Sequence, residues 1–191
     1  MQETQSEYFP LTFQGIDFIC KIMIEGLQVI KPKVHKDERG FFLEMYQKSR
    51  YNGIGVAIDF LQDNHSYSVK SVIRGMHFQK GQAKLVTCAK GKILDVAVDI
   101  RPQSPTFGQY EMVYLTEDNH FQFFIPDGFA HGFCVLSDGA NVIYKVSSLY
   151  DSLLEGGFRY DDPDVAISWP IQNPILSARD QNAPYLRQLD L

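Results

Sequence analysis

The chain has 191 residues, a length that suits one domain with a sizeable core. Hydrophobic residues make up 45% and charged residues 21%, which argues against an intrinsically disordered chain. The net charge of -5 excludes a broad basic surface of the kind that binds DNA or RNA phosphates.

Residues 1–20 are a mixed leader that carries neither a basic signal-peptide start nor an apolar run long enough to span a bilayer. We expect this leader to extend a strand or to be poorly ordered, and residues 21–191 to form a single domain. Cys20, Cys88 and Cys134 are widely spaced and form no CxxC pair. Their number and spacing favour a reducing compartment and predict a cytoplasmic protein without a membrane anchor.

From about Leu27 to Ser148 the chain consists of short runs rich in Val, Ile, Phe and Tyr, separated by Gly, Pro, Asp or Asn. This rhythm predicts antiparallel strands. The expected strands cover residues 27–34, 41–46, 69–77, 84–89, 93–100, 110–115, 121–125, 132–136 and 141–147. So many strands in one domain predict an all-β jelly-roll barrel, because an open sheet of that length would leave vulnerable edges. Helix is expected only as one turn at residues 48–52 and as a short C-terminal helix at 177–186, with Ser177 as its N-cap.

Polar residues within the predicted strands are the first candidates for a functional site. His77 lies in VIRGMHF, where period-two alternation puts Arg74 and Met76 on one face and Ile73, Gly75 and His77 on the other. Either face therefore carries a polar group, which requires an internal hydrogen-bond network or a wet cavity. The residues alone leave both possibilities open.

Three further positions have a structural and a functional interpretation, and a fourth, His65, has a structural one. His131 follows the turn at 126–128 and is next to a glycine that permits close approach. Tyr144 is either a core tyrosine or a site residue, and Lys84 is either an edge charge or part of the site. His65 lies in the polar segment QDNHS, which we expect to be a loop entering a strand.

No metal is expected. A mononuclear site commonly uses two histidines close in sequence plus a carboxylate, and the chain has neither His-x-His nor His-x-x-x-His with such a partner. Arg74 and Lys84 belong to the same polar set, and fixed cations discourage a second cation.

Taken together, the ordered motifs resemble the dTDP-4-dehydrorhamnose 3,5-epimerase family. The motifs are DERGFFLE at 37–44, QDNHS at 62–66, RGMHFQ at 74–79, KLV at 84–86, DVAVDIR at 95–101, SPTFG at 104–108 and PDGFAHGF at 126–133. Each is weak alone, whereas their order and spacing from about Gly26 to Leu186 are specific. The resemblance implies a cupin-type jelly roll, a homodimer, no cofactor, and epimerisation at C3 and C5 of dTDP-4-dehydro-6-deoxy-D-glucose.

The resemblance also implies residue roles. His77 matches a catalytic base and Asp180 its carboxylate partner, Tyr144 matches a proton donor on the opposite side of the sugar, and Lys84 and His131 match residues around the keto oxygen. Other positions match substrate contacts, namely Gln62, Asn64, Arg74, Glu155 and Arg179, where a lysine is usual. Arg39, Phe42 and Glu44 match the segment that reaches the substrate of the neighbouring subunit.

The chemistry gives these residue types a reason. Inversion next to a ketone requires a base on one face, an acid on the other and a group that holds the enolate. A histidine titrates near ~6.5, which suits proton abstraction at neutral pH. A buried cation such as Lys84 stabilises the oxyanion, and paired guanidinium donors suit a diphosphate.

Three alternatives remain from the sequence. A related enzyme could invert one carbon only or isomerise the keto group along the ring. A cupin that binds a sugar nucleotide without turnover is the second possibility, and a metal-dependent cupin enzyme is the third. The loop between Gln79 and Lys84 is also shorter than in many family members, which could alter the rim of the pocket.

Overall fold

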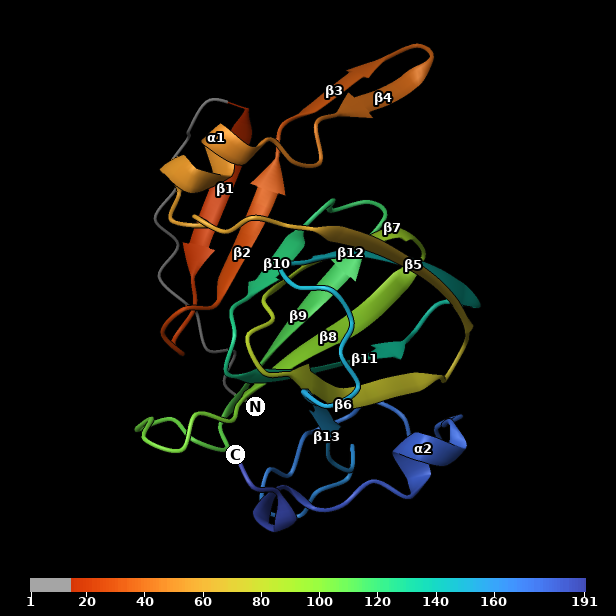
Figure 1. Cartoon of the computed structure of the whole chain (residues 1–191). Helices are drawn as coiled ribbons and strands as arrows, with labels where there is room; N and C mark the ends of the chain where they lie inside the picture. Colours follow the sequence, from red (N-terminus) through yellow and green to blue (C-terminus); the bar gives the residue numbers. More distant parts are fainter. Residues whose placement is uncertain (1–14) are drawn as a thin grey trace.

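The computed structural model describes residues 15–191, and for residues 17–21 the backbone only. Two antiparallel sheets face each other and enclose a barrel (Figure 1). The six-stranded sheet has the order β1 (Ile16–Lys21), β2 (Gln28–Pro32), β10 (Gln122–Ile125), β7 (Lys84–Lys90), β12 (Gly139–Val146) and β5 (Gln62–Val69). The five-stranded sheet has the order β13 (Glu155–Gly157), β6 (Ile73–Gln79), β11 (Phe129–Val135), β8 (Lys92–Asp99) and β9 (Tyr110–Thr116). The predicted cupin-type jelly roll is confirmed.

Three features lie outside the two sheets. The hairpin of β3 (Val34–Asp37) and β4 (Gly40–Leu43) projects away from the barrel (Figure 1). The helix α1 (Lys48–Gly53) begins where a helical turn was predicted. The C-terminal segment contains α2 (Ala178–Gln181) and the 3₁₀ helix η1 (Leu186–Gln188). No helix in residues 15–191 is long and apolar enough to cross a membrane.

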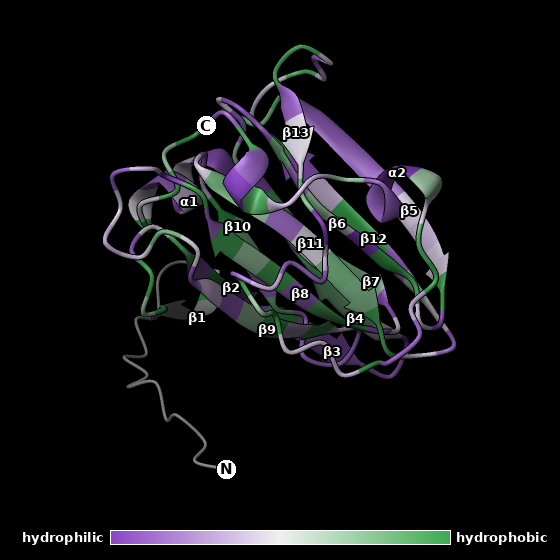
Figure 2. Cartoon of the chain, turned by 90° about the horizontal axis from the view of Figure 1, so that it is seen from below, coloured by the Kyte–Doolittle hydropathy of each residue, from purple (hydrophilic) through white to green (hydrophobic). Residues whose placement is uncertain are grey.

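The barrel interior has two parts: an apolar core and a polar cavity. On β7, Val86 and Cys88 belong to the core between the sheets, and Lys84 shares their face because side chains alternate along a strand. Phe123, Phe129 and other buried hydrophobic residues fill the same core. Figure 2 shows the hydrophobic colouring concentrated on strands such as β7 and β10. The inward row of β7 therefore changes from apolar to cationic where a cavity begins.

A second core lies between the outer face of the five-stranded sheet and the C-terminal segment. Phe158, Val165 and Leu186 of that segment pack with Met76 and Val96 of the sheet. This cover places α2 next to β6. The C-terminal segment thus brings its polar side chains to the strand that carries His77.

Several predicted elements have different bounds. The segment QDNHS is the start of β5 and not a loop, because its side chains alternate between half-buried and exposed positions along an edge strand. The expected strand at 69–77 is divided by a turn at residues 70–71, and β6 extends to Gln79. The expected C-terminal helix ends at Gln181 because Pro184 interrupts it, whereas the predicted Ser177 cap is present. The predicted end of the leader at residue 20 falls inside β1, and residues 1–14 lie outside the described residues.

Candidate functional site

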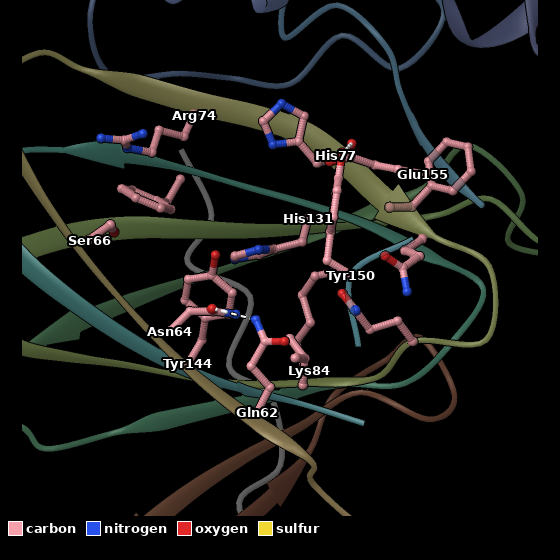
Figure 3. A pocket seen from close by; sticks show the side chains of 15 residues that line it. Gln62, Asn64, Ser66, Arg74, His77, Lys84, His131, Tyr144, Tyr150 and Glu155 are labelled. Atoms are coloured by element: carbon pink, nitrogen blue, oxygen red, sulfur yellow. Dashed lines mark hydrogen bonds between the residues drawn. The ribbon is translucent and has the colours of Figure 1, made fainter. Parts of the chain in front are cut away.

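A cavity of about 390 Å³, which we call the barrel cavity, lies between the two sheets (Figure 3). It brings together many of the predicted site residues, namely Gln62, Asn64, Arg74, His77, Lys84, His131, Tyr144 and Glu155. Its wall also contains residues that the sequence did not indicate, namely Ser66, Phe78, Gln79, Gln82, Phe133, Val146 and Tyr150.

Arg74 and His77 lie on the same side of β6, contrary to the predicted alternation. In the pairing of β6 with β11, His77 is opposite His131 and Arg74 is opposite Phe133, so β6 has one residue more than its partner between these pairs. This bulge shifts the alternation by one residue. Met76 is consequently buried in the outer core, whereas Arg74 and His77 both face the barrel cavity.

His77 is held by a carboxylate from the C-terminal cover. Its Nε2 lies 2.6 Å from Oδ1 of Asp180, a buried residue of α2 that does not itself line the cavity. Burial opposes ionisation of Asp180, but the hydrogen bond and charge of His77 outweigh it and lower the pKa of this carboxyl group. The other ring nitrogen of His77 faces the cavity (Figure 3). The pair thus presents a tautomer-fixed imidazole to whatever occupies the cavity.

Strand β13 packs directly against this imidazole. Gly157 is opposite His77 in the ladder, and a Cβ at Gly157 would lie 2.6 Å from the carbonyl oxygen of Met76 and 3.3 Å from Cδ2 of His77. Glycine at this position therefore permits the close approach that fixes the ring.

A second group of charges lies deeper in the barrel. Lys84 is buried, and burial lowers its pKa to about 8, although the carboxylates of Asp127, Glu155 and Asp95 oppose the shift. Nε2 of His131 lies 2.8 Å from Oδ1 of Asp95. Burial raises the pKa of Asp95, and His131 counteracts part of that rise. With a pKa of about 8, Lys84 remains mostly protonated at neutral pH despite its burial.

Asp95 is a polar site residue that the sequence analysis did not single out. It is fully buried, and its Oδ2 has no hydrogen-bond partner. The available signal was a charged residue within the apolar run ILDVAV, which is rarely buried unless it is paired. Its carboxylate orients His131 and adds negative charge near Lys84.

The wall opposite His77 belongs to the six-stranded sheet. Tyr144 on β12 is paired in register with Asn64 on β5, and the Gln62 side chain donates to Oδ1 of Asn64 at 2.8 Å. Burial raises the pKa of Tyr144, with the charge of Arg74 opposing the rise. Its phenol is therefore protonated at neutral pH, and it stands across the cavity from His77 (Figure 3).

Glu155 lies at the mouth of the cavity and links two neighbouring side chains. Its two carboxylate oxygens accept hydrogen bonds from the Tyr150 hydroxyl and from Nη1 of Arg179, both at 3.0 Å. Arg179 precedes Asp180 on α2 but does not line the cavity.

The remaining predicted residues lie on or next to the projecting hairpin. Arg39 pairs with Asp37, and the Phe42 side chain is exposed. Glu44 forms an ion pair with Arg50. None of these three residues lines the barrel cavity.

Within residues 15–191, no group of three or more His, Cys, Asp or Glu side chains has an arrangement that could hold a metal ion. What the cavity does provide is an imidazole and a phenol from opposite sheets, together with an ammonium group that lines the same cavity. Such an arrangement can remove a proton from one face of a bound molecule, donate a proton to the other face and stabilise an oxyanion.

Known proteins are similar to this chain over nearly its whole length. Residues 21–188 match the family model of dTDP-4-dehydrorhamnose 3,5-epimerase. The Shigella flexneri protein of that name is 48% identical over 168 residues, which are 86% of this chain and 93% of that protein. A dTDP-4-dehydrorhamnose 3-epimerase of Streptomyces niveus is 42% identical over 86% of this chain and 82% of its own.

A solved structure is equally similar. The dTDP-6-deoxy-D-glucose-3,5-epimerase of Legionella pneumophila, in complex with dTDP-4-keto-L-rhamnose, superposes with a TM-score of 0.87 at 46% identity. The similarity covers 90% of this chain and 94% of the Legionella chain. The chain belongs to the dTDP-4-dehydrorhamnose 3,5-epimerase family.

Proposed function

We propose that this protein is a cofactor-independent epimerase that inverts C3 and C5 of dTDP-4-dehydro-6-deoxy-D-glucose and produces dTDP-4-dehydro-L-rhamnose. The observation that carries the proposal is the position of His77 and Tyr144 on opposite sheets across one cavity. One side chain cannot easily reach both faces of a sugar ring, whereas this pair can.

Each inversion then follows in two proton transfers. Asp180 holds His77, and the cavity-facing nitrogen takes the proton from the carbon next to the ketone, whose electrons move onto the carbonyl oxygen. The Lys84 ammonium group stabilises this enolate. Tyr144 gives its proton to the opposite face of the same carbon, the carbonyl re-forms, and exchange with water restores both side chains.

Further substrate contacts belong to the proposal. Gln62, Asn64 and Glu155 suit sugar hydroxyl groups, His131 suits the keto oxygen, and Arg74 suits a phosphate because a guanidinium group offers paired donors. Arg179 acts at the mouth through its ion pair with Glu155.

We propose a homodimer in which Arg39, Phe42 and Glu44 reach the cavity of the neighbouring subunit. Phe42 is 70% exposed on a hairpin that projects away from its own barrel, and a large aromatic side chain in that position is suited to contact another surface. We also propose a cytoplasmic location, which the buried, free thiols of Cys88 and Cys134 support.

The test combines the purified protein with dTDP-4-dehydro-6-deoxy-D-glucose, a rhamnose-forming reductase and NADPH. The expected result is dTDP-L-rhamnose with stoichiometric NADPH oxidation, and no such product with His77→Asn. Absence of dTDP-L-rhamnose with the wild-type protein would overturn the proposal.

Inversion of one carbon only is the second candidate, because a 42% identical relative is a dTDP-4-dehydrorhamnose 3-epimerase. Proton NMR in D₂O separates the two. Deuterium at C3 and C5 supports double epimerisation, whereas deuterium at C3 alone supports the second candidate.

A further inference from the structure

The segment of residues 148–155, which we call the cavity rim, joins β12 to β13 and carries Tyr150 and Glu155 to the mouth of the barrel cavity. Leu149, Tyr150 and Leu153 are 63%, 64% and 91% exposed. Apolar packing therefore contributes little to the position of this segment, and other interactions must fix it.

The side chain of Gln79 supplies those interactions. Its Nε2 donates to Oγ of Ser148 at 2.9 Å and to the carbonyl oxygen of Leu149 at 2.8 Å. Its Oε1 accepts from the backbone N–H of Asp151 at 3.0 Å. Gln79 is only 5% exposed, so these bonds form where water competes weakly. One amide thus fixes the backbone on both sides of Tyr150.

The far end of the rim depends on the same strand. Glu155 is opposite Gln79 in the ladder between β13 and β6, and the backbone N–H of Lys80 donates to the carbonyl oxygen of Leu154. Gln82 donates to Ser148 as well, at 3.1 Å to its carbonyl oxygen, but no hydrogen bond joins the Gln82 side chain to residues 149–151. Gln79 is therefore the side chain that links the strand of His77 to the part of the rim around Tyr150.

We propose that Gln79 is a positioning residue for the epimerisation proposed above, on which this inference rests. Although Gln79 lines the cavity, both of its N–H donors are used on the rim. It acts through Tyr150 and Glu155, whose hydroxyl and carboxylate groups meet at 3.0 Å over the cavity mouth. Both residues line the cavity, Glu155 is a substrate contact in the proposed function, and neither transfers a proton in the proposed mechanism. Displacing them weakens substrate binding more than it slows the chemical steps.

The test is Gln79→Met, which keeps an unbranched side chain of similar length and removes the three hydrogen bonds. KM is expected to rise by about tenfold or more while kcat changes by less than about threefold. His77→Asn has the opposite signature, a large loss of kcat. Gln79→Glu retains the acceptor for Asp151 and loses the donors, so its KM is expected between those of wild type and Gln79→Met.

Asn119→Ala is the matched control. Like Gln79, Asn119 fixes a loop through three hydrogen bonds, and all three of its bonds are to backbone groups: the N–H groups of Thr116 and Phe121 and the carbonyl oxygen of Tyr114. That loop bonds Gly91, after the end of β7, whereas Ser147, the residue directly before the rim, bonds Ala83, before the start of β7. The control is expected to lower the melting temperature without changing KM. An equal KM increase in the control would contradict a specific role of Gln79.

Two further measurements separate positioning from general loss of structure. The KM effects of Gln79→Met and Tyr150→Ala are expected to be far less than additive in the double variant, since both remove the same contact. Additive effects would overturn the proposal. Hydrogen exchange of the Asp151 amide is expected to accelerate in Gln79→Met, because its bond to Oε1 is lost.

The outcomes also separate this inference from the proposed function. An inactive wild-type protein overturns the epimerase proposal, and exchange at Asp151 then still decides whether Gln79 holds the rim. An active wild-type protein with unchanged KM in Gln79→Met overturns the positioning role alone.

Discussion

Nε2 of His77 and Oδ1 of Asp180 lie 2.6 Å apart although the two residues are separated by 103 positions in the sequence. His77 comes from the barrel wall and Asp180 from the helix α2 of the C-terminal cover. The Ser177 hydroxyl caps that helix by accepting from the Asp180 N–H at 3.1 Å, so a single helical turn suffices to present the carboxylate.

Asp180→Asn tests this relationship. An amide keeps the shape but neither stabilises an imidazolium nor enforces the tautomer that leaves the cavity-facing nitrogen free to accept a proton. We expect kcat to fall by roughly 10²–10⁴ with little change in dTDP affinity. Steady-state kinetics and calorimetric titration with dTDP measure the two quantities. Retention of wild-type kcat would remove Asp180 from the mechanism.

The sequence predicted the apolar strands well and the strands of the cavity less well. The run 93–100 is almost continuously hydrophobic, as expected of a strand buried on both faces, and it was predicted within one residue of β8. Strand β5 was missed because its inward row of Gln62, Asn64 and Ser66 faces the cavity and lacks the hydrophobic alternation by which strands are recognised. The polar side chains that line the cavity thus remove the sequence pattern that would have predicted β5 as a strand.

Contacts between residues far apart in the sequence account for the other differences between the predicted and the observed site. The bulge in β6 moves Arg74 to the side of His77, and no local pattern reveals it. Gln79 and Tyr150 belong to the site only because the rim folds against β6, a contact that the local sequence does not encode. The resemblance to a family, and not spacing, led to Asp180, because nothing in its own segment indicates a partner on a distant strand.

Lys84 predicts an alkaline limb in the rate profile. Burial lowers its pKa to about 8, so its charge is lost as pH rises through that value and enolate stabilisation is lost with it. We expect kcat/KM to fall above about pH 8. In Lys84→Gln the rate is expected to be lower by roughly 10²–10³ at pH 7 and to lack this limb. An unchanged limb in the variant would assign it to another group.

The lowered pKa of Lys84 also makes folding stability depend on pH: stability rises with pH over the range in which the rate falls. An unfolded lysine titrates near ~10.4, so the folded state disfavours the charged form below pH 8. This penalty is relieved as pH rises from about 8 to about 10.4, and Lys84→Met removes it. Denaturant unfolding at several pH values is expected to show a stability gain for Lys84→Met that is largest below pH 8.

Asp95→Asn is expected to move that alkaline limb to lower pH. The Asp95 carboxylate is one of the negative charges that raise the pKa of Lys84, with Asp127 and Glu155, so its neutralisation makes protonation of Lys84 less favourable. The control is Asp138→Asn, because the Asp138 side chain is fully exposed on a turn. A limb that stays in place in Asp95→Asn would show that Asp95 does not act on Lys84.

Mixing two inactive variants tests whether the hairpin works in the neighbouring subunit. The His77→Asn variant has a defective cavity and an intact hairpin. The Arg39→Ala variant has an intact cavity and a defective hairpin. If the hairpin acts between subunits, the mixed dimer contains one complete site, and subunit exchange should restore about a quarter of wild-type activity. No recovery, despite mixed dimers seen by native mass spectrometry, would place the function of Arg39 within its own subunit.

Isotope exchange tests the central claim, opposed proton transfer by His77 and Tyr144, most directly. Proton NMR in D₂O follows C3 and C5 of the dTDP-linked keto sugar with wild type, His77→Asn and Tyr144→Phe. We predict deuterium at both carbons with wild type and at neither with His77→Asn. Tyr144→Phe should still introduce deuterium into recovered substrate while inverted product forms far more slowly. Exchange at the wild-type rate in His77→Asn would contradict the account.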